Sequence, residues 1–210
     1  MKKIILIILI LLFLPLFAEK KELQFFIGTG VYFPTGNMET DDKTTLVFKS
    51  WTFPLEAQIG LTERIWLGAY CSYTTLSDTN IKNYTTDKGE KGTLWFDYER
   101  WNFDLQAKFI LLAGYPVSIN AIGGLGGIVD TWRNQSLYLN NQDAWSNDFD
   151  NSNYSEFNWN YQGGLDITYR VWWNILAKVE FLYNTSKNTT GYEANIYLGY
   201  SHFPSSYKWF

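Results

Sequence analysis

The segment "FNWNYQGGLDITYR", residues 157–170, reads differently at its odd and its even positions. The odd positions are mostly aromatic or aliphatic: Phe157, Trp159, Tyr161, Gly163, Leu165, Ile167 and Tyr169. The even positions are mostly polar: Asn158, Asn160, Gln162, Gly164, Asp166, Thr168 and Arg170. Successive side chains of a β-strand point to opposite faces. The segment therefore predicts a strand with one apolar and one polar face, and the fold depends on which face points inward.

The same alternation predicts seven further strands along the chain. Their approximate ranges are 23–33, 50–61, 64–74, 94–111, 116–129, 173–184 and 192–203. Each is about as long as a strand that crosses a bilayer at a tilt. Neither a sustained helical periodicity nor a long apolar run follows residue 18. An all-β protein of eight antiparallel strands is expected.

The connections between these strands fall into two classes. Three are short turns, "LTERI" (61–65), "LAGYPV" (112–117) and "YRVW" (169–172). Four are polar segments that read as long loops: 34–45, 77–92, 133–155 and 184–191. Short turns at one end and long loops at the other are the layout of an up-and-down transmembrane β-barrel, with the turns in the periplasm and the loops outside the cell.

The N-terminus has the parts of a secretory signal peptide. Lys2 and Lys3 precede an apolar run from Ile4 to Leu14, and Ala18 precedes the charged "EKKE". This pattern predicts a signal peptide over 1–18 and a mature barrel over 19–210. Without the two leading lysines, acidic residues outnumber basic ones, so a nucleic-acid partner is not expected.

The volume of a small barrel decides which face points inward. Eight strands enclose an interior only just wide enough for side chains. The apolar faces carry the bulky rings, so these rings are expected to point outward into lipid. A soluble periplasmic lipid carrier would need the opposite arrangement, with the rings inside around a ligand, and its interior would be overfilled.

Aromatic residues, 19% of the chain, fall near the two ends of the predicted strands. One group lies near the short turns and consists of Trp66, Tyr115, Tyr169, Trp172, Trp173 and Tyr200. The other lies toward the long loops and consists of Trp51, Trp95, Trp101, Trp159, Tyr183 and Tyr192. Two belts are expected where a barrel meets the two membrane interfaces. The alternative is that aromatic residues simply favour strands.

With these features the chain resembles the small eight-stranded outer-membrane barrels, the class of the OmpA membrane domain, OmpX and OmpW. The resemblance rests on the export signal, the strand count, the alternation and the turn asymmetry, and no short motif indicates a subfamily. It implies outer-membrane lipid as the surroundings and the barrel-assembly machinery as a partner during biogenesis. Such barrels usually end in a strand with a C-terminal Phe. Phe210 fits that pattern, whereas Pro204 and Lys208 depart from it.

Closing the strands into a barrel sends a set of polar and charged side chains into the lumen. The set comprises Glu56, Gln58, Asp104, Gln106, Lys108, Asp166, Lys178, Glu180 and Glu193. Glu56, Lys108, Asp166 and Lys178 lie at similar distances from the short turns, and buried charges must be paired. A salt-bridged plug is expected. The alternative is a narrow path that opens when these ion pairs exchange partners.

The sequence indicates a protein that is not an enzyme and that needs no cofactor or metal. Its one histidine, His202, follows Ser201 at the periplasmic end and has no acidic residue near it in sequence, unlike the catalytic groups of lipid-modifying barrels. Asp143, Asp148 and Asp150 offer oxygen ligands of the kind calcium prefers. The spacing of an EF-hand is absent, so a solvated loop is expected instead.

The leading functional hypothesis is a surface-exposed structural or adhesin-like barrel whose long loops make the contacts. The candidate contact residues are the aromatic side chains of the third loop, Trp145, Phe149 and Tyr154, which would meet an extracellular ligand or a host surface. The alternative is a narrow, OmpW-like channel for small solutes. A soluble lipid carrier and a lipid-modifying barrel enzyme rank below both.

Overall fold

The computed structural model describes residues 22–35, 50–85, 89–139, 144–146, 154–187 and 190–202. These residues form nine strands: β1 (Leu23–Pro34), β2 (Ser50–Gly60), β3 (Ile65–Thr85), β4 (Lys91–Gly114), β5 (Val117–Leu139), β6 (Ala144–Trp145), β7 (Tyr154–Arg170), β8 (Ile175–Ser186) and β9 (Thr190–His202). None of the described residues belongs to a helix that is long and apolar enough to cross a membrane.

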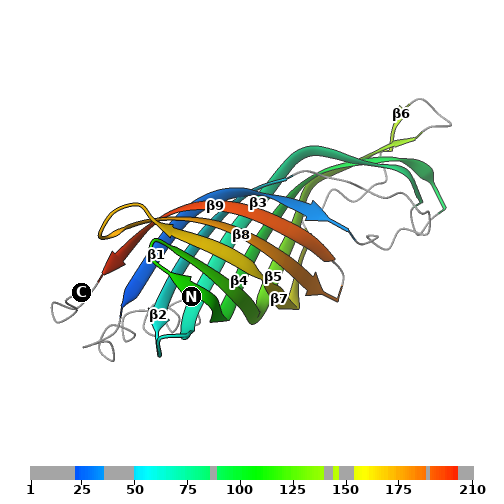
Figure 1. Ribbon diagram of the computed structural model, residues 1–210. Coiled ribbons are helices and arrows are strands. Elements are labelled where there is room, and N and C mark those ends of the chain that lie inside the picture. Colours follow the sequence, from blue (N-terminus) through cyan, green and yellow to red (C-terminus); the bar gives the residue numbers. More distant parts are fainter. Residues whose placement is uncertain are drawn as a thin grey trace, which may run out of the picture.

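Eight of the strands form a closed antiparallel barrel (Figure 1). Neighbours pair in the order β4, β3, β2, β1, β9, β8, β7, β5, and a ladder between β5 and β4 closes the ring, while β6 pairs only with β5. From Val31, the ladders through β2, β3 and β4 lead to Thr131, whereas those through β9, β8 and β7 lead to Ala121. This stagger of ten residues in β5 requires strands that tilt against the barrel axis.

The eight predicted strands are all present, but four of them extend at least three residues further than the alternation indicated. β3 continues to Thr85, β4 begins at Lys91, β5 continues to Leu139 and β7 begins at Tyr154. The prediction of loops over most of 77–92 and over 133–139 was therefore wrong, and the segment between β8 and β9 shrinks to residues 187–189. The polar Thr, Asn and Ser residues in these segments indicated contact with water. Because a strand outside the membrane also contacts water, its composition cannot be distinguished from that of a loop.

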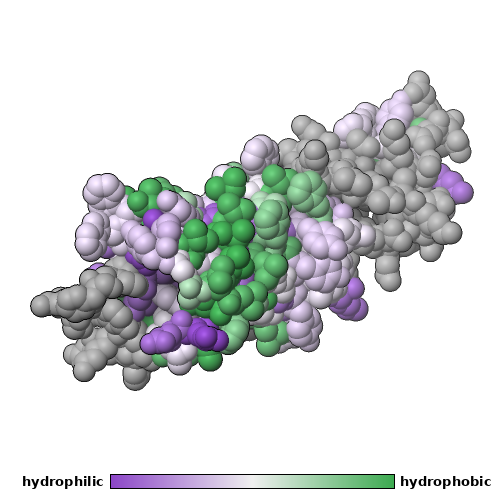
Figure 2. All heavy atoms as spheres, viewed as in Figure 1, coloured by the Kyte–Doolittle hydropathy of each residue, from purple (hydrophilic) through white to green (hydrophobic). Residues whose placement is uncertain are grey.

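The apolar faces point outward and the polar faces point inward. In β7, Trp159 is 64% exposed, whereas its neighbour Asn160 is 0% exposed. Figure 2 shows hydrophobic residues gathered in a band across the visible face of the barrel, with more hydrophilic residues on both sides of it. An exterior of this kind suits hydrocarbon. The rings therefore do not surround an internal ligand, as a soluble carrier would require.

Ten of the twelve predicted belt residues are exposed on the outside of the barrel. The two exceptions have clear structural reasons. Trp66 alternates with the exposed Ile65 and Leu67, so it faces inward, and its ring packs against Gly60 near the short turns. Trp95 pairs with Ser136, past the last β5–β7 pair at Trp132, and so lies outside the barrel wall.

A few rings point into the lumen, and glycines on the neighbouring strand give them room. Phe26 lies opposite Gly199, and Tyr197 lies opposite Gly28. A Cβ atom on Gly199 would lie 2.4 Å from the Phe26 ring, and one on Gly28 would lie 2.6 Å from the Tyr197 ring. The two rings meet edge to face at 6.1 Å between centroids. This pairing brings the Tyr197 ring and hydroxyl to the charged cluster described next.

Candidate functional site

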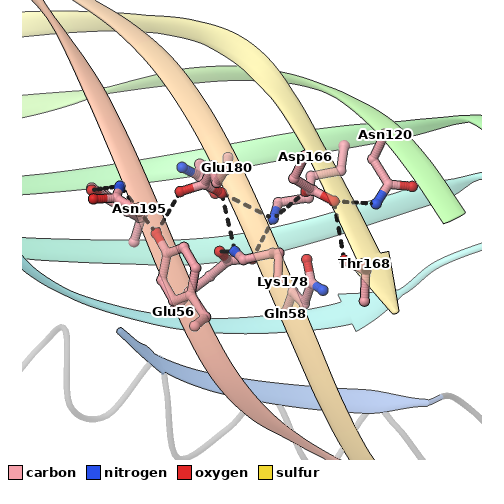
Figure 3. A network of polar contacts seen from close by, with 12 residues as sticks. Glu56, Gln58, Asn120, Asp166, Thr168, Lys178, Glu180 and Asn195 are labelled. Atoms are coloured by element: carbon pink, nitrogen blue, oxygen red, sulfur yellow. Dashed lines mark hydrogen bonds and ion pairs between the residues drawn. The ribbon is translucent and has the colours of Figure 1, made fainter. Parts of the chain in front are cut away.

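A network of buried charges, here called the lower cluster, crosses the lumen at the end with the short turns. It consists of Glu56 from β2, Lys108 from β4, Asp166 from β7, and Lys178 and Glu180 from β8. Lys108 Nζ lies 2.5 Å from Glu56 Oε1, 3.0 Å from Asp166 Oδ2 and 3.6 Å from Glu180 Oε2. Lys178 Nζ pairs with Glu56 and lies 3.0 Å from Glu180 Oε2. Because β2 and β8 are not neighbours, these pairs span the lumen itself (Figure 3).

Neutral side chains complete the coordination of the lower cluster. Asn120 and Thr168 donate hydrogen bonds to Asp166 Oδ1 at 2.5 and 3.1 Å, and the Tyr197 hydroxyl donates to Glu180. Lys178 Nζ also lies 3.8 Å from the centre of the Tyr197 ring, a cation–π distance. Each charge thus has several partners, which a buried ion needs to offset its lost hydration.

A chain of amide and carboxylate groups crosses the middle of the lumen. Gln106 donates to Gln162 at 2.6 Å, and Gln162 donates to Asn184 at 3.0 Å. Asn184 in turn donates to Glu193 at 3.1 Å, and the Tyr70 hydroxyl donates to the same carboxylate at 2.6 Å. Five strands are joined by this chain, from β4 through β7, β8 and β9 to β3.

A separate ion pair lies at the end of the lumen away from the short turns. Arg100 Nε is 2.7 Å from Asp130 Oδ1, and the Tyr98 hydroxyl donates to the same oxygen at 2.5 Å. The Arg100 guanidinium also lies 4.8 Å from the centre of the Tyr32 ring. All four residues are buried.

Glu22 joins three elements at the opposite mouth of the barrel. Its Oε1 accepts hydrogen bonds from Arg170 at 2.8 Å, from Gln24 at 2.8 Å and from the Ser201 hydroxyl at 2.5 Å. Ser201 is therefore bonded to the Glu22 carboxylate, while His202 is exposed. Within the described ranges, no group of three or more His, Cys, Asp or Glu side chains is placed to hold a metal ion.

The structure places all nine predicted lumen residues in the interior. Glu56, Lys108, Asp166, Lys178 and Glu180 meet in the lower cluster, Gln106 and Glu193 belong to the amide chain, and Gln58 donates to Gln24 at 2.5 Å. Asp104 accepts hydrogen bonds from Asn160 at 3.0 and 3.1 Å.

Sequence reasoning missed four lumen residues that make central contacts. Asp130 lies one residue past the predicted end of its strand, so the prediction contained no carboxylate that could pair with Arg100. Arg100 does share the alternation of Asn102 and Asp104, and that signal could have assigned it to the lumen. Tyr70 and Tyr197 also follow the polar alternation, but their contacts with carboxylates depend on the barrel's closure.

The predicted contact residues of the third loop have different outcomes. Trp145 lies in β6, is 54% exposed and meets the Tyr138 ring edge to face at 5.3 Å. Tyr154 is the first residue of β7 and pairs with Trp132. Phe149 lies outside the described residues, as do the predicted signal peptide, Asp143, Asp148, Asp150, Pro204, Lys208 and Phe210.

No protein-family model matches the chain, and no curated protein matches it. Several solved structures do match. The attachment invasion locus protein Ail of Yersinia pestis is 12% identical with a TM-score of 0.54, and the match covers 87% of this chain and 99% of Ail. Neisserial surface protein A is 10% identical with a TM-score of 0.55, covering 86% of this chain and 96% of that protein.

The outer membrane protein OprG of Pseudomonas aeruginosa is similar to the same extent. It is 11% identical with a TM-score of 0.51, and the match covers 88% of this chain and 96% of OprG. The chain therefore has the fold of the small eight-stranded outer-membrane barrels. Its apolar exterior and polar interior are those of a barrel that spans a membrane.

Proposed function

We propose that this protein is an integral barrel of the bacterial outer membrane that binds an extracellular ligand or a host surface, while its lumen is closed by the lower cluster. Its role is contact, not catalysis. In this proposal the short turns lie in the periplasm, and the barrel-assembly machinery inserts the exported chain. The observation that carries the proposal is an extension of three strands beyond the barrel wall at the loop end.

The extension consists of the ends of β3, β4 and β5. The β2–β3 ladder ends at Thr75, and the β5–β7 ladder ends at Trp132. The β3–β4 ladder, in contrast, continues to Thr85, and the β4–β5 ladder continues to Leu139. Figure 1 shows these strands running on past the rest of the barrel, with β6 at their far end.

One side of the extension is a packed core and the other side presents aromatic rings. The core consists of Leu94, Phe96, Tyr98, Leu137 and Leu139, with Trp132 against it. On the other side, Trp95 is 37% exposed and Trp145 is 54% exposed. A hydrogen-bonded sheet backed by a core holds such rings in place, so little side-chain entropy is lost when they bind a partner.

The comparison with Ail, the attachment invasion locus protein of Yersinia pestis, supports an adhesin-like role without identifying a partner. The test uses the full chain displayed on a bacterial strain that has no adhesins of its own. The probe is an immobilised panel of extracellular-matrix glycoproteins and glycans. The expected result is adhesion that falls at least tenfold in a Trp95→Ala, Trp145→Ala double variant.

Trp172→Ala is the matched control, because Trp172 is 66% exposed but lies at the end with the short turns. Adhesion of this variant should equal that of the wild type. The proposal is overturned if displayed wild-type protein adheres to no member of the panel, or if Trp172→Ala reduces adhesion as much as the double variant does.

A narrow channel for small solutes is the second candidate function, and one observation favours it. The hydroxyl groups of Thr52, Ser72 and Thr74 are buried on the inward side of β2 and β3 and have no hydrogen-bond partner among the described residues. Such groups require water. Conductance in planar bilayers separates the two functions. Steady openings that disappear in Lys178→Ala would establish the channel and rule out the closed lumen.

A further inference from the structure

One buried amide in the lumen faces more acceptors than it can satisfy. Asn160 Nδ2 lies 3.0 and 3.1 Å from the two carboxylate oxygens of Asp104, and 3.3 Å from both Asn102 Oδ1 and Asn184 Oδ1. All four residues are at most 4% exposed. A carboxamide nitrogen carries only two hydrogens, so at least two of these four oxygens remain without a donor from it. Of the four, Asn184 Oδ1 also accepts a hydrogen bond from Gln162 at 3.0 Å.

The same group of residues holds two atoms without partners. Asn160 Oδ1 and Asn102 Nδ2 are buried and form no hydrogen bond with any described residue. The nitrogen and oxygen of a carboxamide exchange places when the group rotates by half a turn. Rotation of the Asn160 carboxamide would point its oxygen at the two carboxylate oxygens of Asp104 and at the carboxamide oxygens of Asn102 and Asn184. Five oxygens that face one another are favourable only around a positive charge.

The balance of buried charge independently calls for a cation. Among the described residues, the buried carboxylates are Glu56, Asp104, Asp130, Asp166, Glu180 and Glu193, whereas the buried cations are Arg100, Lys108 and Lys178. Both lysines bind within the lower cluster, and Arg100 pairs with Asp130. The Asp104 carboxylate receives its hydrogen bonds from the Asn160 amide. The Glu193 carboxylate, which Asn184 connects to this group of residues, receives its hydrogen bonds from amides and from the Tyr70 hydroxyl.

Two strands approach each other closely at the Asp104 carboxylate. Gly126 of β5 pairs with Asp104, and a Cβ atom there would lie 1.9 Å from the Phe103 backbone oxygen and 2.4 Å from Asp104 Oδ1. The surrounding oxygens come from β4, β7 and β8, three strands fixed by barrel ladders. The oxygens therefore converge from a rigid frame.

We propose that Asn102, Asp104, Asn160 and Asn184 form a cation site in the lumen, and that its ligand is Ca²⁺. The site offers two carboxylate oxygens and three carboxamide oxygens. Calcium accepts six to eight oxygen ligands at about 2.3–2.6 Å in flexible geometry, so water completes the shell and the oxygens move inward by a few tenths of an ångström. Magnesium requires a stricter octahedron and gives up its water reluctantly, so it binds this site less well.

The test is calorimetric titration of CaCl₂ into the refolded full-length mature chain in detergent, after removal of metal with a chelator. The expected result is one Ca²⁺ per barrel, a binding constant at least tenfold weaker for Mg²⁺, and a higher unfolding temperature with Ca²⁺. Asp104→Asn should weaken Ca²⁺ binding at least tenfold.

Asp97→Asn is the matched control, because it removes a carboxylate of the extension that accepts a hydrogen bond from Asn134. It should bind Ca²⁺ like the wild type. The site is overturned if the wild type binds no Ca²⁺, or if Asp104→Asn retains full affinity, which would assign binding to other carboxylates such as those of residues 143–150. Adhesion is measured separately, so the failure of one proposal leaves the other standing.

Discussion

The two halves of the lumen are built from the same alternating strands but satisfy their polar groups differently. In the lower cluster, Lys108 and Lys178 bind three carboxylates, and neutral donors complete the shell. In the half toward the loops, hydroxyls such as those of Thr52 and Thr74 have no partner among the described residues. The comparison teaches that the protein itself balances the charges of the lower cluster, whereas hydroxyls on β2 and β3 toward the loops depend on water.

Removing one charge from the lower cluster should have the largest effect on stability. Lys108→Ala leaves Asp166 without its lysine and Glu56 and Glu180 with only Lys178, and breaking a buried ion pair costs about 3 to 5 kcal/mol. Urea unfolding of the refolded barrel in lipid vesicles measures this loss.

Lys91→Ala is the control for that measurement, because Lys91 is exposed at the start of β4. Its effect should stay within about 0.5 kcal/mol, as for most surface substitutions. Equal unfolding midpoints for the two variants would mean that the lower cluster does not support the barrel.

A smaller loss of stability is expected when the chain of hydrogen-bonded amides and carboxylates across the middle of the lumen is interrupted. Tyr70→Phe removes the hydroxyl that donates to Glu193 at 2.6 Å, and hydrogen bonds to charged groups contribute about 1.5 to 3 kcal/mol. The same unfolding assay should show a loss of about 2 kcal/mol. Tyr161→Phe is a suitable reference, since Tyr161 is 60% exposed on the outer face, and a loss there of similar size would contradict the assignment.

The smallest effects compare equivalent substitutions in the two halves. Thr168→Val removes a donor to Asp166 and should cost about 1 to 2 kcal/mol. Thr74→Val removes a buried hydroxyl that has no partner among the described residues, so its effect should lie within about 0.5 kcal/mol of zero or be slightly stabilising. If the two variants lose the same stability, the halves do not differ as described.

Much of the barrel could be predicted from local alternation, because the environment of each side chain in a strand has a period of two. That rule placed Glu56 and Lys178 inside and Trp159 outside. It could not predict that Glu56 and Lys178 would meet, since β2 and β8 are not neighbours and their contact depends on the stagger of the closed ring.

The extension and the calcium site were beyond sequence reasoning for other reasons. The ends of β3 and β5 are rich in polar residues, and a strand in water resembles a loop in composition. The convergence of oxygens on Asn160 joins single residues from three strands, none of which stands out in its own segment. The space for the inward-facing Phe26 ring depends on Gly199 opposite it, which only the register reveals.

The most direct test of a barrel with its apolar face in lipid and its polar face in the lumen uses residues 157–170. In a Cys71→Ala background, single cysteines at 159 to 166 would carry a nitroxide label, with the chain refolded in lipid vesicles. Collisions with lipid-soluble oxygen, measured by electron paramagnetic resonance, should be frequent at the positions of Trp159, Tyr161 and Leu165 and rare at those of Asn160, Gln162 and Asp166. A reversed alternation, or none, would contradict the placement of the apolar face in lipid.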